Sequence, residues 1–115
     1  MASFNRIVIF CPSLRGGGAE RFVVNLACGL NRYNYKVYLL LTKAEGPFLS
    51  YLTDNVKIID FNRSRVLFCF YDLVKYIKDE NPPILLSVLS HANIIAILAN
   101  MFLSSKTRLI VSERT

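Results

Sequence analysis

Residues 6–30, RIVIFCPSLRGGGAERFVVNLACGL, decide the fold, because an apolar run stops at three glycines and then resumes with a different period. Residues 7–11 form a short, unbroken apolar run, which is typical of a strand buried on both faces. After the glycines the apolar residues recur at the spacing of one helix face: Phe22, Val23, Leu26, Ala27 and Leu30. The stretch predicts a strand, a glycine-rich turn and an amphipathic helix.

Such a turn leaves the first amide N–H groups of the helix unpaired, where the helix dipole also favours negative charge. This arrangement is typical of phosphate and anion sites, and glycine lets a ligand approach the backbone closely. The candidate phosphate- or substrate-binding residues are Arg15, Gly16, Gly17, Gly18 and Glu20. A purely structural tight turn is the alternative.

Two better-known nucleotide motifs do not fit the glycine turn. A dinucleotide fingerprint needs a third glycine where this chain has Arg21. A P-loop needs Lys and then Ser or Thr after its last glycine, and here Ala19 and Glu20 follow. Both classes of site are therefore disfavoured.

Length and composition indicate one α/β domain. The chain has 115 residues, enough for a single core, and its apolar fraction of 53% fits strands covered by helices on both faces. The net charge of +6 is spread along the sequence, without the dense basic run or zinc-finger pattern of a nucleic-acid binder. A phosphate-bearing substrate or an anionic membrane surface fits that charge better.

The cysteine pattern favours a cytoplasmic protein. Cys11, Cys28 and Cys69 are far apart and odd in number, so we expect small buried residues in a reducing compartment. With His91 as the only histidine, we expect no metal site. The apolar run near the amino terminus is too short for a signal peptide.

The rest of the chain continues the alternation of strands and helices. We expect further strands at residues 36–42, 56–61, 84–89 and 108–112, a short helix at 48–52, and helices at 66–79 and 93–103. The pattern predicts a Rossmann-like parallel sheet of about five strands with helices on both faces, forming a single domain over residues 1–115.

Two stretches raise the question of a membrane. Residues 84–102 are almost uncharged, but Ser, His and Asn within them favour a strand followed by a helix over a membrane span. The helix at residues 66–79, near Arg63, Arg65, Lys75 and Lys78, would suit an anionic membrane surface. We prefer core packing for that helix, with the cations extending into solvent.

Polar residues after the fourth strand complete the candidate site. In a doubly wound sheet, ligands bind beyond the carboxyl ends of the strands where the strand order reverses. If the order is 3-2-1-4-5, that point lies between the glycine turn and His91. His91 is the candidate catalytic residue and Asn93 a second polar contact, with helix capping or packing as the alternative role of His91.

The segment PSLRGGGAERFVVNLACGL resembles the first strand, loop and helix of family 4 of the glycosyltransferases, retaining nucleotide-sugar enzymes with the GT-B fold. The form G-G-A-E-R is common in members that build bacterial surface polysaccharides and lipid-linked sugars. The resemblance is strong over the first third of the chain and weak over the rest. Pro83 stands where relatives usually have Asp.

The resemblance implies the amino-terminal, acceptor-binding part of a longer enzyme, without the carboxy-terminal domain that holds the nucleotide-sugar and the E-x7-E glutamates. We therefore expect these 115 residues alone to be inactive. The implied substrates are a nucleoside diphosphate sugar, with no permanently bound cofactor, and an acceptor sugar or lipid-linked sugar. The implied location is the cytoplasm or the inner face of the membrane.

The resemblance also bears on single residues. Many relatives carry a polar residue or His after the fourth strand, facing the donor sugar, and this supports a role for His91. Ser112-Glu113-Arg114 resembles the family segment S-E-R, so Glu113 and Arg114 either line the acceptor side or form a salt bridge. Two competing functions remain: a non-catalytic flavodoxin-like nucleotide- or phosphate-binding module, and an interaction domain that docks on a membrane-bound partner.

Overall fold

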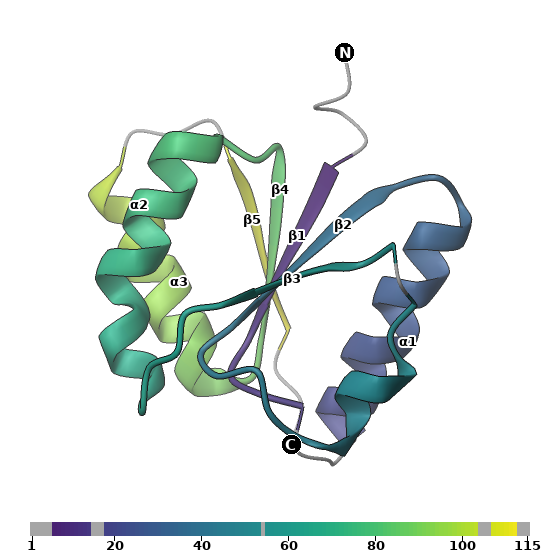
Figure 1. Cartoon of the computed structure of the whole chain (residues 1–115). Helices are drawn as coiled ribbons and strands as arrows, with labels where there is room; N and C mark the ends of the chain where they lie inside the picture. The colour runs from purple at the N-terminus through teal and green to yellow at the C-terminus, as the bar shows by residue number, and fades with distance from the viewer. Residues whose placement is uncertain (1–5, 15–17, 54, 104–106, 113–115) are drawn as a thin grey trace.

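A five-stranded, all-parallel sheet lies between helix α1 on one face and helices α2 and α3 on the other (Figure 1). The computed structural model describes residues 6–14, 18–53, 55–103 and 107–112. The predicted Rossmann-like α/β arrangement is confirmed.

The described elements alternate along the chain. The strands are β1 (Arg6–Cys11), β2 (Lys36–Leu41), β3 (Lys57–Asp60), β4 (Ile84–Val88) and β5 (Arg108–Ser112). The helices are α1 (Gly18–Arg32), α2 (Phe70–Glu80) and α3 (Ser90–Phe102), with short 3₁₀ segments η2 (Pro47–Tyr51) and η3 (Val66–Cys69).

The strand order is β3-β2-β1-β4-β5, so β1 and β4 lie side by side at the centre of the sheet. Ile7 pairs with Val37 of β2 on one side and with Ile84 of β4 on the other. A flavodoxin-like sheet has the order 2-1-3-4-5, in which the first strand pairs with the third. The order seen here is that of a Rossmann-like sheet, with its reversal between β1 and β4.

The sheet separates two hydrophobic cores, and β1 contributes to both. Ile7 and Ile9 belong to the cluster that includes buried residues of α1, whereas Val8 and Phe10 belong to the cluster that includes α2 and α3. Because successive side chains of a strand point to opposite faces, a strand covered on both sides must be apolar throughout. This explains the unbroken apolar run at residues 7–11.

Helix boundaries differ from the sequence prediction at two places. The predicted helix at residues 66–79 begins as the 3₁₀ segment η3, and the α-helix proper starts at Phe70. Helix α3 starts at Ser90, three residues before the predicted 93, because Leu89 alone turns the chain from β4 into the helix. The strands agree with the prediction to within a residue or two at each end.

The two stretches that raised the question of a membrane are both part of the fold. Residues 84–102 form β4 and α3, as expected, and Leu73 and Ile77 of α2 are fully buried in the core. None of the helices in the described part of the chain is long and apolar enough to span a bilayer.

Candidate functional site

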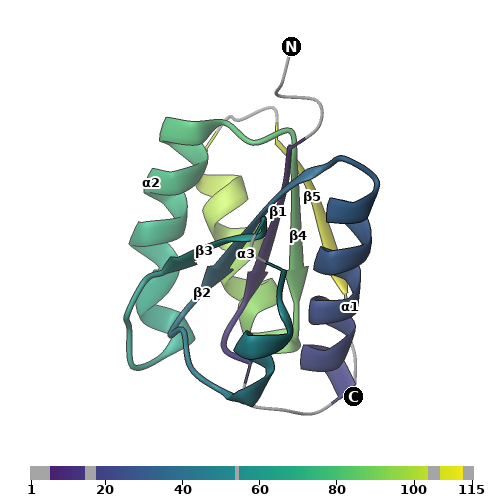
Figure 2. The ribbon, with the colours of Figure 1, turned by 45° about the vertical axis from the view of Figure 1, so that its right-hand side comes forward.

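The candidate site lies at the carboxyl ends of the two central strands. Strand β1 ends at Cys11 and β4 at Val88, and helices α1 and α3 both begin at this edge of the sheet (Figure 2). The sheet thus brings the start of α1, which follows the glycine turn, and the start of α3 to the point where the strand order reverses. Two helix N-termini at one edge give this region a positive potential.

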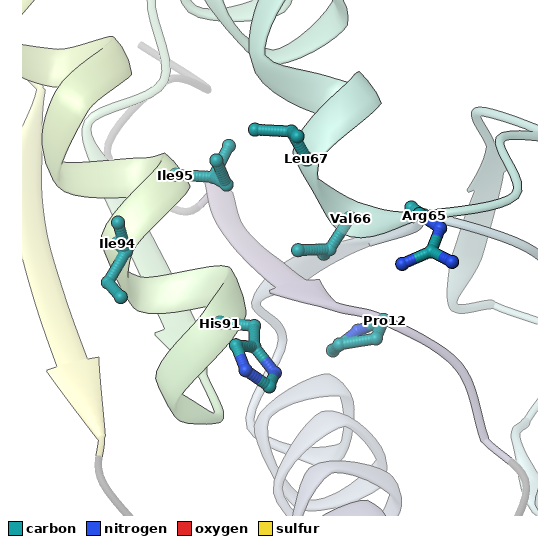
Figure 3. Close-up of a pocket in the computed structure, with 7 residues that line it drawn as sticks. All are labelled: Pro12, Arg65, Val66, Leu67, His91, Ile94 and Ile95. Carbon is teal, nitrogen blue, oxygen red and sulfur yellow. The ribbon is translucent and has the colours of Figure 1, made fainter.

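A pocket of about 460 Å³ opens at this edge (Figure 3). Pro12 contributes from the end of β1, Arg65 and the first residues of η3 from the segment after β3, and His91 from the first turn of α3. The remaining lining is apolar and consists of Val66, Leu67, Ile94 and Ile95. The pocket therefore combines an apolar wall with one guanidinium group and one imidazole.

A strained residue places His91 at the pocket. Leu89 has φ 84° and ψ 142°, a backbone conformation that residues other than glycine rarely adopt. Its N–H donates to the Ser112 carbonyl at 3.2 Å, and its carbonyl accepts from the Asn93 N–H at 2.8 Å. These bonds hold a one-residue turn, which lets α3 begin immediately after β4 with His91 in its first turn. Strain of this kind is concentrated at functional sites in proteins.

Arg65 lies at the pocket because residues 61–63, which precede it, are held by contacts with β2 and α2. The Phe61 N–H donates to the Leu41 carbonyl at 2.9 Å, which ties the segment to β2. The Arg63 guanidinium donates two hydrogen bonds to the Asp72 carboxylate, at 2.7 and 3.0 Å, which ties it to α2. Hydrogen bonding to Asp72 raises the pKa of Arg63. The Asp72 carboxylate is thus bound to Arg63, and the exposed side chain of Arg65 lines the pocket.

Two of the predicted anion-binding residues lie in the first turn of α1. Gly18 is its first residue and is exposed, and Glu20 is half-buried. Burial, and secondarily the charge of Glu20, raise the pKa of the Cys11 thiol to about 12.

Asn93 is buried at the start of α3 and contacts the end of β5. Its side chain is 2% exposed, and its Nδ2 donates to the Ser112 carbonyl at 3.0 Å. Asn93 therefore ties α3 to the end of β5, and it is not among the described residues that line the pocket.

Several predicted residues lie outside the described part of the chain: Arg15, Gly16, Gly17, Glu113 and Arg114. The pocket also contains residues that the sequence did not predict as site residues: Pro12, Arg65, Leu67 and Ile94. Arg65 follows the third predicted strand, so its place at the carboxyl edge could have been inferred from topology. Leu67 and Ile94 gave no such signal, because both read as ordinary helix residues.

Among the described residues, no three or more His, Cys, Asp or Glu side chains gather in a way that could hold a metal ion. No protein-family model matches the chain, and a search of curated proteins finds no match either.

Proposed function

We propose that the chain is the amino-terminal part of a glycosyltransferase, which transfers a sugar from a nucleoside diphosphate donor to an acceptor hydroxyl. The observation that carries the proposal is the position of His91, which lines a pocket at the point where the strand order reverses, on the same sheet edge as the start of α1. The resemblance of PSLRGGGAERFVVNLACGL to family 4 glycosyltransferases supplies the reaction class.

The chemistry expected of this edge follows from its charges. In the transfer, the bond from the anomeric carbon to the diphosphate breaks, a bond to the acceptor oxygen forms, and negative charge grows on the departing diphosphate. Amide N–H groups at the start of α1 would stabilise that charge, because preorganised donors act most strongly where charge develops. The His91 imidazole would hydrogen-bond a sugar hydroxyl or a phosphate oxygen.

Gly18 offers a sharp test of the anion site. A Cβ at Gly18 would meet no heavy atom within 4 Å, so a small side chain fits there. A carboxylate at this helix terminus also favours the folded state through the helix dipole. Gly18→Asp should therefore stay folded while repelling a phosphate, and Gly18→Asn is a neutral control of almost the same shape.

The experiment measures sugar transfer from a panel of nucleoside diphosphate sugars, using the protein encoded by the whole reading frame. We expect transfer by the parent and by Gly18→Asn, and a loss of about tenfold or more in Gly18→Asp and in His91→Ala. Equal activity of Gly18→Asp and Gly18→Asn would contradict the anion site.

The same protein also tests the alternative function, a non-catalytic nucleotide- or phosphate-binding module. Binding of nucleoside diphosphates that Gly18→Asp weakens, without transfer to any acceptor, would replace the enzyme with a non-catalytic phosphate-binding module. Absence of both binding and transfer would overturn both functions.

A further inference from the structure

A groove of about 540 Å³ lies between α1 and the short segment η2, and it shares no lining residue with the pocket that contains His91. Helix α1 lines one wall with Arg21, Val24, Asn25, Cys28 and Arg32, and residues 48–53 line the other with Phe48, Tyr51 and Thr53. Because about 3.6 residues complete a turn of an α-helix, the α1 residues of this set share one side of the helix. We call this hollow the α1–η2 groove.

Arg21 and Arg32 lie at opposite ends of the α1–η2 groove. They are 11 positions apart in α1, which places their Cα atoms about 16 Å apart along the helix axis. Residues 48–53 run in the same direction beside the helix. The Arg21 guanidinium lies 6.0 Å from the centroid of the Phe48 ring, and further along the Cys28 thiol donates to the Tyr51 carbonyl at 3.6 Å. The groove is therefore elongated, with a guanidinium group at each end.

The positive charge at the two ends is not balanced by the walls. No acidic side chain is among the described residues that line the groove, and neither Arg21 nor Arg32 forms an ion pair with another residue that the structure describes. Contact with the Phe48 ring orients the Arg21 guanidinium without cancelling its charge. The groove thus complements a ligand that carries a negative group at each end.

Between its two ends the groove is mostly apolar. Val24 is buried and Cys28 half-buried in the α1 wall, and the rings of Phe48 and Tyr51 meet with centroids 5.7 Å apart. The Tyr51 side chain is nevertheless 64% exposed, which leaves aromatic surface available for contact with a ligand. Asn25 is exposed on the same side of α1, and its amide offers both a donor and an acceptor, as a peptide group requires.

We propose that the α1–η2 groove binds an extended acidic segment of a partner protein with the pattern acid-x-apolar-x-acid. Alternate side chains of an extended chain point to the same side, and the two acidic residues of this pattern are separated by about 13 Å. Their carboxylates would bind Arg21 and Arg32, whose side chains are long enough to close the remaining distance. The apolar side chain would pack on Tyr51 and the Asn25 amide would bind the peptide backbone. The contact does not use Gly18 or His91, so it does not depend on the proposed sugar transfer.

The spacing of the two arginines favours a peptide over two other occupants. A nucleotide has its negative charge on one side of its ring, whereas the guanidinium groups lie at opposite ends of the groove. A second copy of this chain lacks the pattern, because no two of its acidic residues are four positions apart.

The electrostatic contribution is tested by calorimetric titration of the full chain with the peptide Glu-Ser-Phe-Ser-Glu, blocked at both ends. Arg21→Gln/Arg32→Gln should weaken binding by about tenfold, because two charge-assisted contacts at exposed residues are lost. Lys75→Gln/Lys78→Gln removes the same charge at exposed residues of α2, in the opposite layer, and should bind like the parent. Peptides with Gln at both ends, or with Ser in place of Phe, should also bind more weakly.

A charge exchange shows whether the arginines contact the peptide directly. Arg21→Glu/Arg32→Glu should lose binding of Glu-Ser-Phe-Ser-Glu and gain binding of Lys-Ser-Phe-Ser-Lys, a gain that a misfolded variant would not show. Lys75→Glu/Lys78→Glu makes the same change in net charge and should not gain binding of the lysine peptide.

Cys28 reports where the peptide binds. It lines the groove and is half-buried, whereas Cys11 and Cys69 are fully buried, so alkylation of the folded protein by iodoacetamide should occur at Cys28. Saturating Glu-Ser-Phe-Ser-Glu should slow this alkylation several-fold, as measured by mass spectrometry.

Three results would overturn the proposal. The first is absence of peptide binding by the parent, and the second is equal binding by Arg21→Gln/Arg32→Gln and Lys75→Gln/Lys78→Gln. The third is protection of Cys28 by adenosine monophosphate but not by the peptide, which would assign the groove to a small phosphate-bearing molecule.

Discussion

At the scale of single residues, the least expected side chain is Ser87 in the central strand β4. It is fully buried between its register neighbours Phe10 and Val111, and its Oγ has no hydrogen-bond partner among the residues that the structure describes. A buried hydroxyl without a partner costs about 1–3 kcal/mol. We therefore expect Ser87→Ala to raise the free energy of unfolding by about 1 kcal/mol, as measured by urea denaturation.

Thr107 provides the matched control for Ser87. It is also buried, but its Oγ1 donates to the Pro82 carbonyl at 2.7 Å. Thr107→Val keeps the shape and removes that bond, so it should lower the free energy of unfolding by about 1 kcal/mol. A loss of stability in Ser87→Ala would mean that the hydroxyl of Ser87 is satisfied in solution.

At the scale of elements, three asparagines end or connect secondary structure in the left-handed conformation. Asn34, Asn62 and Asn81 have φ of 71°, 55° and 46° and follow α1, β3 and α2 respectively. At the end of α2, the Asn81 N–H donates to the Ile77 carbonyl at 2.9 Å and so closes the helix. Asparagine tolerates this conformation better than other residues that have a side chain.

The left-handed conformation of Asn81 makes the end of α2 sensitive to substitution. Asn81→Ala should lower the free energy of unfolding by about 1 kcal/mol, because alanine is disfavoured in the left-handed region. Asn81→Gly should leave it unchanged or slightly higher, since glycine is the preferred residue at such ends. Thermal unfolding of the two variants beside the parent measures the difference. Equal stability of the two variants would show that the end of α2 adopts another conformation in solution.

At the scale of the whole molecule, the sheet could be predicted from sequence because its signals are local. Strands β1, β2 and β4 are short apolar runs that closely follow an asparagine or a proline, and the run at residues 108–112 coincides with β5. Short right-handed crossovers then leave few possible strand orders, and 3-2-1-4-5 is the order found.

The site was less predictable because its walls come from distant parts of the sequence. His91 could be placed at the sheet edge from topology, but nothing local indicates that η3 packs beside α3 and brings Leu67 to the same pocket. The orientation of α3 was hidden for a related reason. Both of its sides are apolar, so periodicity alone cannot tell that the alanines face inward and that Ile94, Leu98 and Met101 face out.

The stability of the whole fold should depend on alkaline pH. Burial, with a smaller effect of Glu20, raises the pKa of Cys11 from 9.0 to about 12, and burial raises the pKa of Tyr76 from 10.0 to about 12. Above pH 9 the unfolded chain releases these protons while the folded chain keeps them, so the free energy of unfolding falls as pH rises towards 12. Below pH 9 these groups are protonated in both states, and their contribution does not change with pH.

Urea denaturation between about pH 8 and about pH 11 measures this slope. Cys11→Ala should reduce the slope, even though the smaller side chain lowers stability at every pH, because one group that resists ionisation in the fold is gone. Val23→Ala is the control, because it removes buried apolar atoms from the same core as Cys11 without removing an ionisable group, and it should retain the slope of the parent. If Cys11→Ala and the parent lost stability with the same slope, the thiol of Cys11 would be accessible to ionisation in the folded protein, and the end of β1 would be less tightly covered than its burial in the α1 core implies.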